Sequence, residues 1–259
     1  MVLNYLLYGI IGVIGGLHSA SYGAYKDSPY ESFVLRRFVR EIILAFFIGI
    51  LLSFFYFEKR ERYFVIFLVI MGLSRTATEF YKLFLREENQ DPFLIPTQAH
   101  FFKKVVKNKI LRIALGFFCI MIIYAIFLIS VSLPDAFSKT ERGLYIGFLT
   151  GFITAVGGGY KDGFFEGFNK IKFFRSPVIG AIGGVLIALN TEIIFFILFG
   201  AIGFERMIVE LYKGFLKRMY SPGKFKLKNP KYVSWFNRRK IFILPYSLTW
   251  LFFIILLFI

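Results

Sequence analysis

Apolar stretches of about 18 or more residues recur along this chain of 259 residues, and short charged segments separate them. A helix of about 20 apolar residues crosses the hydrocarbon core of a bilayer, which is about 30 Å thick. Hydrophobic residues make up 57% of the chain and aromatic residues 20%, and this composition excludes a soluble globular protein. The sequence therefore predicts an all-α polytopic membrane protein.

We expect about eight transmembrane helices. The sixth and seventh apolar stretches are nearly continuous, because only Asn190, Thr191 and Glu192 interrupt them. The first stretch lacks the basic segment that begins a signal peptide, so we expect it to be a true membrane span. The expected spans are 3–21, 41–57, 63–82, 110–133, 143–159, 177–198, 193–213 and 240–259.

Lysine and arginine give the chain a net charge of +16 and concentrate in four segments between spans. These four segments are 18–40, 82–112, 157–177 and 213–240. Because cytoplasmic loops are enriched in Lys and Arg, we predict that the four segments are cytoplasmic and that both termini lie on the opposite side. We expect them to bind anionic lipid headgroups and not nucleic acid. Their basic and aromatic parts, 86–109 and 214–240, also suit short interfacial helices.

Two segments of the first half recur in the second half and predict an internal repeat. Residues 12–40 align without gaps on 147–175 with 11 identities in 29 positions, and residues 72–86 align on 203–217 with 7 in 15. The identities include charged and aromatic residues, so they are more specific than the likeness of two apolar helices.

The repeat predicts two parallel four-helix units, 1–133 and 134–259, which we call the first and second copies. Each copy has an even number of spans, so both enter the membrane in the same direction. We therefore expect a pseudo-two-fold axis along the membrane normal, and this architecture is similar to that of parallel-repeat transporters.

The first repeated motif is predicted to lie at the cytoplasmic end of the first helix of each copy. One interpretation is an anion site in which the lysines meet a phosphate or carboxylate near a helix N-terminus. A second is a divalent cation held by Asp27 and Glu31. A third is purely structural, because Ser28 and Glu31 have the spacing of a capping box. The motif comprises Tyr25, Lys26, Asp27, Glu31 and Arg40 in the first copy, and Tyr160, Lys161, Asp162, Glu166 and Arg175 in the second.

The second repeated motif places charged residues on one helical face inside a predicted span. Ionisable groups within membranes are costly and commonly face a protein interior or a wet cavity, so they are candidates for function. The alternative is an Arg–Glu pair that neutralises itself within one helix. The motif comprises Arg75, Glu79 and Lys82 in the first copy and Arg206, Glu210 and Lys213 in the second, and Arg86 and Lys217 continue the two faces.

The remaining reactive residue types give weaker signals. His18 has Ile153 as its counterpart in the second copy, so a proton-relay role is conceivable, although a lone histidine is more often simply hydrogen-bonded. His100 and Cys119 lack the ligand spacing of a zinc site, and we expect no metal site of this kind.

These patterns support three functional hypotheses. The first is a transporter, channel or flippase-like protein for a small anion or a phosphate-bearing amphiphile, with its site between the two copies on the cytoplasmic side. The second is a membrane enzyme that acts on a lipid phosphate. The third is a scaffold subunit that assembles with other membrane proteins or with itself. The retention of the charged residues in both copies favours symmetric binding or structure over a single catalytic site.

Overall fold

The computed structural model describes residues 2–56, 61–216, 224–226 and 229–259, and within these ranges the chain is almost entirely helical. The long helices are α1 (Val2–Asp27), α2 (Leu35–Tyr56), α3 (Tyr63–Phe80), α4 (Lys109–Val131), α5 (Lys139–Glu166), α6 (Lys170–Ala188), α7 (Ile194–Leu211) and α9 (Ile243–Phe258). Shorter elements are the π-helical turns η1 (Tyr81–Leu85) and η2 (Tyr212–Leu216), the strands β1 (His100–Phe101) and β2 (Lys104–Val105), α8 (Val233–Arg238) and the 3₁₀ turn η3 (Arg239–Phe242).

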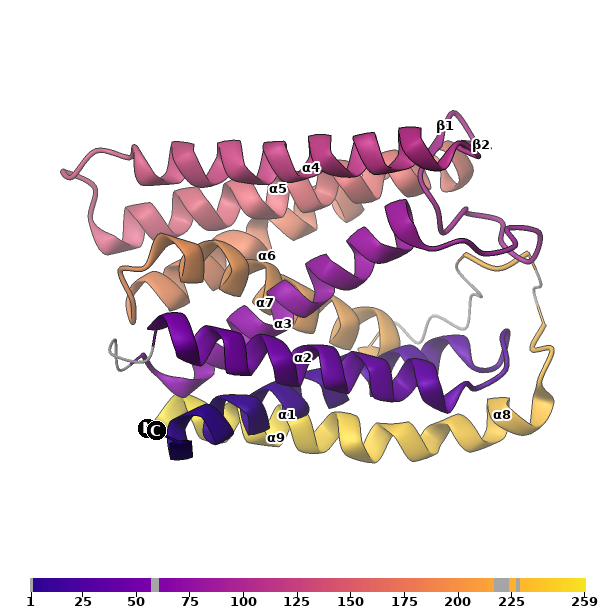
Figure 1. The fold of residues 1–259 in the computed structure, drawn as a ribbon, viewed down its shortest axis with the longest axis horizontal. Coiled ribbons are helices and arrows are strands. Elements are labelled where there is room, and N and C mark those ends of the chain that lie inside the picture. Colours follow the sequence, from indigo (N-terminus) through magenta and orange to yellow (C-terminus); the bar gives the residue numbers. More distant parts are fainter. Residues whose placement is uncertain (1, 57–60, 217–223, 227–228) are drawn as a thin grey trace.

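The long helices form one bundle in which successive helices run in opposite directions (Figure 1). The start of α1 and the end of α9 lie at the same end of this bundle. We call the opposite end the loop end, and there α1, η1 and α5 finish and the β1–β2 hairpin and α8 lie.

In the part of the chain that the structure describes, six helical segments are long and apolar enough to cross a membrane, which indicates a multi-pass membrane protein. They are Leu35–Phe55, Tyr63–Leu85, Lys109–Val131, Lys139–Glu166, Lys170–Ala188 and Val233–Phe258. The two others of the expected eight, α1 and α7, are not among the six. Helix α7 holds Glu205, Arg206 and Glu210 within its 18 residues, so three charged side chains interrupt its apolar sequence.

The expected spans 177–198 and 193–213 overlap, whereas the structure separates α6 from α7. Asn190 donates a hydrogen bond to the carbonyl of Leu186, and Thr191 accepts one from the backbone N–H of Ile193. These polar side chains satisfy backbone groups at the end of one helix and the start of the next. The short polar interruption is therefore a real turn.

Helices α3 and α7 form the centre of the bundle. Eight consecutive residues of α3, Phe64–Met71, are buried, and a helix that is apolar and buried on all sides lies inside a protein. At the crossing of α3 and α7, a β-carbon added to Gly72 would lie 1.9 Å from the carbonyl oxygen of Phe199, and one added to Gly203 would lie 2.0 Å from that of Leu68. Small residues of this kind let membrane helices touch backbone to backbone.

Glycines also join α1 to α2 and α5 to α6. The β-carbon positions of Gly12 and Gly49 meet backbone carbonyls of the partner helix, those of Ala45 and Tyr8. The same contacts occur 135 residues later in the chain. There Gly147 meets the carbonyl of Gly180, and Gly184 meets that of Gly143.

The outer faces of the bundle carry large apolar side chains that no other part of the described chain covers. Phe47 on α2, Phe117 on α4 and Leu251 on α9 are each more than half exposed. An apolar exterior around a buried core is the arrangement expected of helices surrounded by lipid.

The fourth helix of each half packs on the other half of the chain. Helix α4 contacts α7 and α5 as well as η1, and α9 contacts α1 and α3. The two halves therefore do not form separate bundles of four helices. Helix α4 of the first half packs on helices of the second half, and α9 of the second half packs on helices of the first.

At the loop end, two local expectations are wrong. Residues 28–34 form a turn and not the start of a helix, because α2 begins only at Leu35. The hydroxyl of Ser28 donates to the carbonyl of Ala24 and so does not cap a helix. The segment 86–108 contains no helix and instead includes the β1–β2 hairpin, whereas α8 does provide a short helix in the second basic segment.

Candidate functional site

Two Arg–Glu pairs lie near each other where α3 and α7 approach the loop end. An Arg75 guanidinium nitrogen is 2.8 Å from Glu79 Oε1 one turn later, and Arg206 contacts Glu210 in the same way. Each pair also acts electrostatically on the other. Arg206 stabilises the negative charge of Glu79, and Arg75 stabilises the negative charge of Glu210. We call these four residues the central charge cluster.

Around Glu79 the structure adds two lysines to the pair. Lys82 Nζ lies 3.4 Å from Glu79 Oε1, and Lys161 Nζ, from the end of α5, lies 3.7 Å from Glu79 Oε2. The side chains of Glu79, Lys82 and Lys161 are between 27% and 30% exposed, so solvent or a ligand can reach them. Lys161 belongs to the first predicted motif and Glu79 to the second, and the fold therefore brings the two motifs together.

Around Glu210 the surroundings differ. Its side chain is only 3% exposed, and the third group beside it is His18, whose Nε2 lies 3.5 Å from Glu210 Oε2. The guanidinium of Arg206 also lies over the ring of Tyr22 at 5.9 Å. The two related carboxylates thus have different partners: Glu79 faces lysines at a partly open position, and Glu210 faces a buried histidine.

Positive charge exceeds negative charge at this place. Lys82, Lys161 and the two cluster arginines act on the cluster carboxylates, and Lys26 and Lys213 lie further out among these cations, while Asp27, Glu41 and Glu205 add negative charge nearby. Within the described ranges, Lys26 and Lys213 form no ion pair with a carboxylate. Lys26 is exposed, and the charge that acts on it most is that of the adjacent Asp27, followed by more distant cations that include Arg206 and Arg75. Lys213 lies within electrostatic reach of Arg206 and Lys26.

The carboxylates of the first predicted motif are paired with lysines outside the central charge cluster. Lys224 Nζ lies 3.2 Å from Asp27 Oδ2 and 3.7 Å from Glu31 Oε1. Lys172 Nζ lies 3.1 Å from Asp162 Oδ2, and it also contacts Glu166, which belongs to the same motif, at 2.8 Å. A lysine therefore occupies the position between each pair of carboxylates that the cation hypothesis gives to a metal. Among the residues whose placement the structure gives, no three His, Cys, Asp or Glu side chains form a metal-binding group.

The contact with Lys224 changes the ionisation of that residue. Burial alone lowers the pKa of Lys224, but the carboxylates of Asp27 and Glu31 outweigh burial and hold this pKa above its ordinary value. The ammonium group therefore stays charged, and it ties the segment around residue 225 to the end of α1.

Backbone and ring contacts hold the same segment in place. The carbonyl of Lys224 accepts hydrogen bonds from the backbone N–H groups of Leu94 and Ile95. The ring of Phe225 packs between those of Tyr30 and Phe93.

The aromatic and arginine members of the motifs lie beside the cluster and not within it. Arg40 lies over the ring of Tyr81 at 5.4 Å, and Arg175 lies over that of Tyr212 at 5.7 Å. Tyr160 donates to the carbonyl of His100. Tyr25 stacks on Phe215 and lies under the guanidinium of Arg239. These residues hold helix ends together, while Lys217, the last basic residue of the second motif, lies outside the described residues.

Sequence reasoning missed several partners that come from distant parts of the chain. Thr78 on α3 donates to Glu41 on α2 at 2.7 Å, and Ser176 on α6 donates to Glu205 on α7 at 2.6 Å. Glu41 and Glu205 are ionisable residues inside or beside predicted spans, which was a usable signal. Neither residue has an acidic counterpart in the other copy, so neither belongs to a repeated motif.

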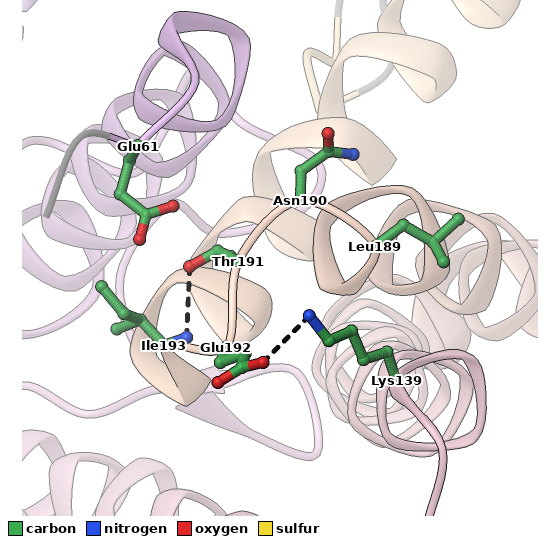
Figure 2. Close-up of a pocket in the computed structure, with 7 residues that line it drawn as sticks. All are labelled: Glu61, Lys139, Leu189, Asn190, Thr191, Glu192 and Ile193. Atoms are coloured by element: carbon green, nitrogen blue, oxygen red, sulfur yellow. Dashed lines mark hydrogen bonds and ion pairs between the residues drawn. The ribbon is translucent and has the colours of Figure 1, made fainter.

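Two shallow pockets of about 350 Å³ lie away from the cluster or at its edge. One lies at the end of the bundle opposite the loop end, where Lys139 and Glu192 form an ion pair of 2.9 Å (Figure 2). Its other lining residues are Glu61, Leu189, Asn190, Thr191 and Ile193. The second pocket is mostly apolar and is lined by Leu211, Phe215, Tyr246, Ser247 and Trp250.

Comparisons with known proteins give no assignment for this site. No protein-family model matches the chain, and neither the curated proteins nor the solved structures include a match. The chemistry of the site therefore rests on its own residues and their contacts.

Proposed function

We infer that this protein is a membrane transporter, channel or flippase-like protein that binds a small anion or a phosphate-bearing amphiphile at the central charge cluster. The observation that carries this proposal is that Lys26 and Lys213 lie within electrostatic reach of the cluster arginines and form no ion pair within the described ranges. Charges inside a membrane protein are costly unless they are paired or hydrated, and unpaired lysines among arginines attract an anion. Lysine and arginine are also the usual partners of phosphate oxygens.

The proposal includes an architecture of eight membrane crossings in two parallel four-helix copies, 1–133 and 134–259. In support, Gly72 and Gly203 make reciprocal contacts across α3 and α7, as expected of residues near a pseudo-two-fold axis. Further support comes from contacts that recur at fixed sequence offsets. They are the glycine contacts of α1–α2 and α5–α6, the Arg–Glu pairs, the arginine–tyrosine contacts, and the pairs Arg37–Glu31 and Lys172–Glu166.

The proposed orientation places the loop end in the cytoplasm and both termini on the opposite side. Its support is the positive-inside rule, because the four basic segments all belong to the loop end. In this orientation the anion site would open toward the cytoplasm, and the basic loops would lie against anionic lipid headgroups.

A test of the proposal uses purified protein in liposomes. We expect wild-type protein to bind inorganic phosphate or sulfate and to carry one of these anions, or a fluorescent phospholipid, across the bilayer. The variant with both Lys26→Gln and Lys213→Gln should bind the anion about a hundredfold more weakly or worse, because each lost charge-assisted contact is worth about 1.5 kcal/mol or more. The variant Lys170→Gln, which loses an exposed lysine at the same end without an ion pair, is the matched control.

The other two hypotheses give different results in the same experiment. A membrane enzyme would release a soluble product from a lipid phosphate without net transport. A scaffold would bind no anion, and its double lysine variant would be at least as stable as wild type because like charges have been removed. Either result would replace the transport proposal.

A further inference from the structure

We propose that His18 and Glu210 form a proton-binding site inside the bundle, and that this proton is the coupling ion of transport. The coupling rests on the proposed function, whereas the proton site stands on geometry alone. His18 lies on α1 and is fully buried, and its two ring nitrogens face different partners on α9 and α7.

The first ring nitrogen of His18 has a defined role. Nδ1 lies 2.9 Å from the hydroxyl oxygen of Thr249. This hydroxyl has a single proton, which it donates to the backbone carbonyl of Tyr246 at 2.7 Å. A carbonyl only accepts, so Thr249 accepts from His18 and Nδ1 must carry a proton.

The second ring nitrogen then faces a carboxylate. If Nδ1 alone carried the proton, the lone pair of Nε2 would lie 3.5 Å from Glu210 Oε2, and two acceptors would face each other at a buried position. Burying such a contact is unfavourable, and one proton between the two atoms removes the repulsion. A flipped ring would place carbon atoms at both contacts, so it offers no alternative.

The remaining groups around the pair favour an ionised Glu210. Arg206 holds the other oxygen of Glu210, and Arg75 on α3 also stabilises the charge of this carboxylate. With Glu210 ionised, the shared proton resides on His18. The rings of Tyr22, Tyr246 and Trp250 enclose the pair and separate it from the surface.

The proton site explains the asymmetry between the two copies. Glu79 has the ammonium group of Lys161 as its cation from a neighbouring helix. Glu210 has His18, a cation that exists only while the proton is bound. Loss of the proton removes one positive charge from the central charge cluster, so anion binding and proton binding strengthen each other.

An apolar pocket lies beside the proton site. Tyr246 and Trp250 contact His18 and also line this pocket of about 350 Å³.

The proton site is tested by nitrogen NMR of protein labelled with ¹⁵N-histidine in lipid nanodiscs. The chain has only two histidines, and the variant His18→Gln assigns their signals. We expect both ring nitrogens of His18 to carry protons at neutral pH, and Glu210→Gln should convert this ring to the singly protonated form. A singly protonated ring in wild-type protein would overturn the site, whatever the protein transports.

The coupling is tested with sulfate, whose own charge is constant between about pH 5 and 8. We expect a pH gradient to drive sulfate into liposomes that contain wild-type protein. In His18→Gln, sulfate binding should persist, while the gradient should no longer drive accumulation. Gradient-driven accumulation by His18→Gln would overturn the coupling. Failure of wild-type protein to bind sulfate or phosphate would instead refute the proposed function and leave the NMR result to decide the proton site.

Discussion

The close approach of α3 and α7 gives a sharp prediction for Gly72→Ala. The added methyl group would lie 1.9 Å from the carbonyl oxygen of Phe199, whereas carbon and oxygen atoms ordinarily stay about 3.3 Å apart. The contacted atom belongs to the backbone, so no side-chain rotation relieves the clash. The two helices must separate by about 1.4 Å at this point, or the backbone must bend.

The magnitude depends on the packing at the centre of the bundle. A gap of even 0.5–1 Å forfeits about a quarter to a half of the dispersion energy of the contacts involved, and overpacking in cores costs about 1–3 kcal/mol. Alanine favours a helix over glycine by about 1 kcal/mol, which offsets part of this loss. We therefore expect the free energy of unfolding to fall by about 2 kcal/mol.

The assay is thermal unfolding in one detergent, with Gly157→Ala on α5 as the control. Among the described residues, no atom outside the local backbone of α5 lies within 4 Å of the β-carbon position of Gly157, so this variant should gain up to about 1 kcal/mol from helix propensity alone. The same substitution should thus have opposite signs at the two positions. If Gly72→Ala proved as stable as Gly157→Ala, the backbone contact between α3 and α7 would be refuted.

Three further predictions address single contacts. Ser138 caps the N-terminus of α5 in a capping box, so Ser138→Ala should lower the free energy of unfolding by about 1 kcal/mol. The control Ser132→Ala, in the exposed turn before α5, should change this free energy little. Equal effects of the two variants in thermal unfolding would contradict the cap. Ser176→Ala removes the hydroxyl that donates to the buried carboxylate of Glu205, so the free energy of unfolding should fall by about 1–3 kcal/mol. An unchanged free energy of unfolding would refute this hydrogen bond. The folded-state pKa of Lys224 is raised above the ordinary 10.5, so its stabilising contribution is complete below pH 10.5 and is lost as the pH rises through the folded-state pKa. Lys224→Met should therefore be less stable than wild type at neutral pH, and its stability should fall less steeply than that of wild type above pH 10.5 in alkaline unfolding. If the stabilities of both proteins fell in parallel above pH 10.5, the contact would be refuted.

Helical class and multi-pass character could be predicted from the chain alone. Hydrocarbon offers no hydrogen bonds to the backbone, so a run of about 20 apolar residues has little choice but to form a helix. The pairing of Arg75 with Glu79 could be predicted in the same way, because residues four apart on a helix are neighbours. Such features depend on residues close together in sequence, and local geometry decides them.

The partners across helices came only from the tertiary structure. The Lys161–Glu79 contact joins two motifs that lie far apart in the sequence, and Lys224 reaches Asp27 from a loop whose path no periodicity indicates. The capping interpretation of Ser28 was wrong because the chain turns away to pack against that loop.

The sequence by itself determined a helical membrane protein with repeated charged motifs, because hydrophobicity and helical spacing are local properties. Only the tertiary structure decided which charges remain unpaired and which histidine nitrogen faces Glu210. Those outcomes depend on how α1, α3, α7 and α9 pack, and packing brings together residues that the sequence separates by as many as 231 positions.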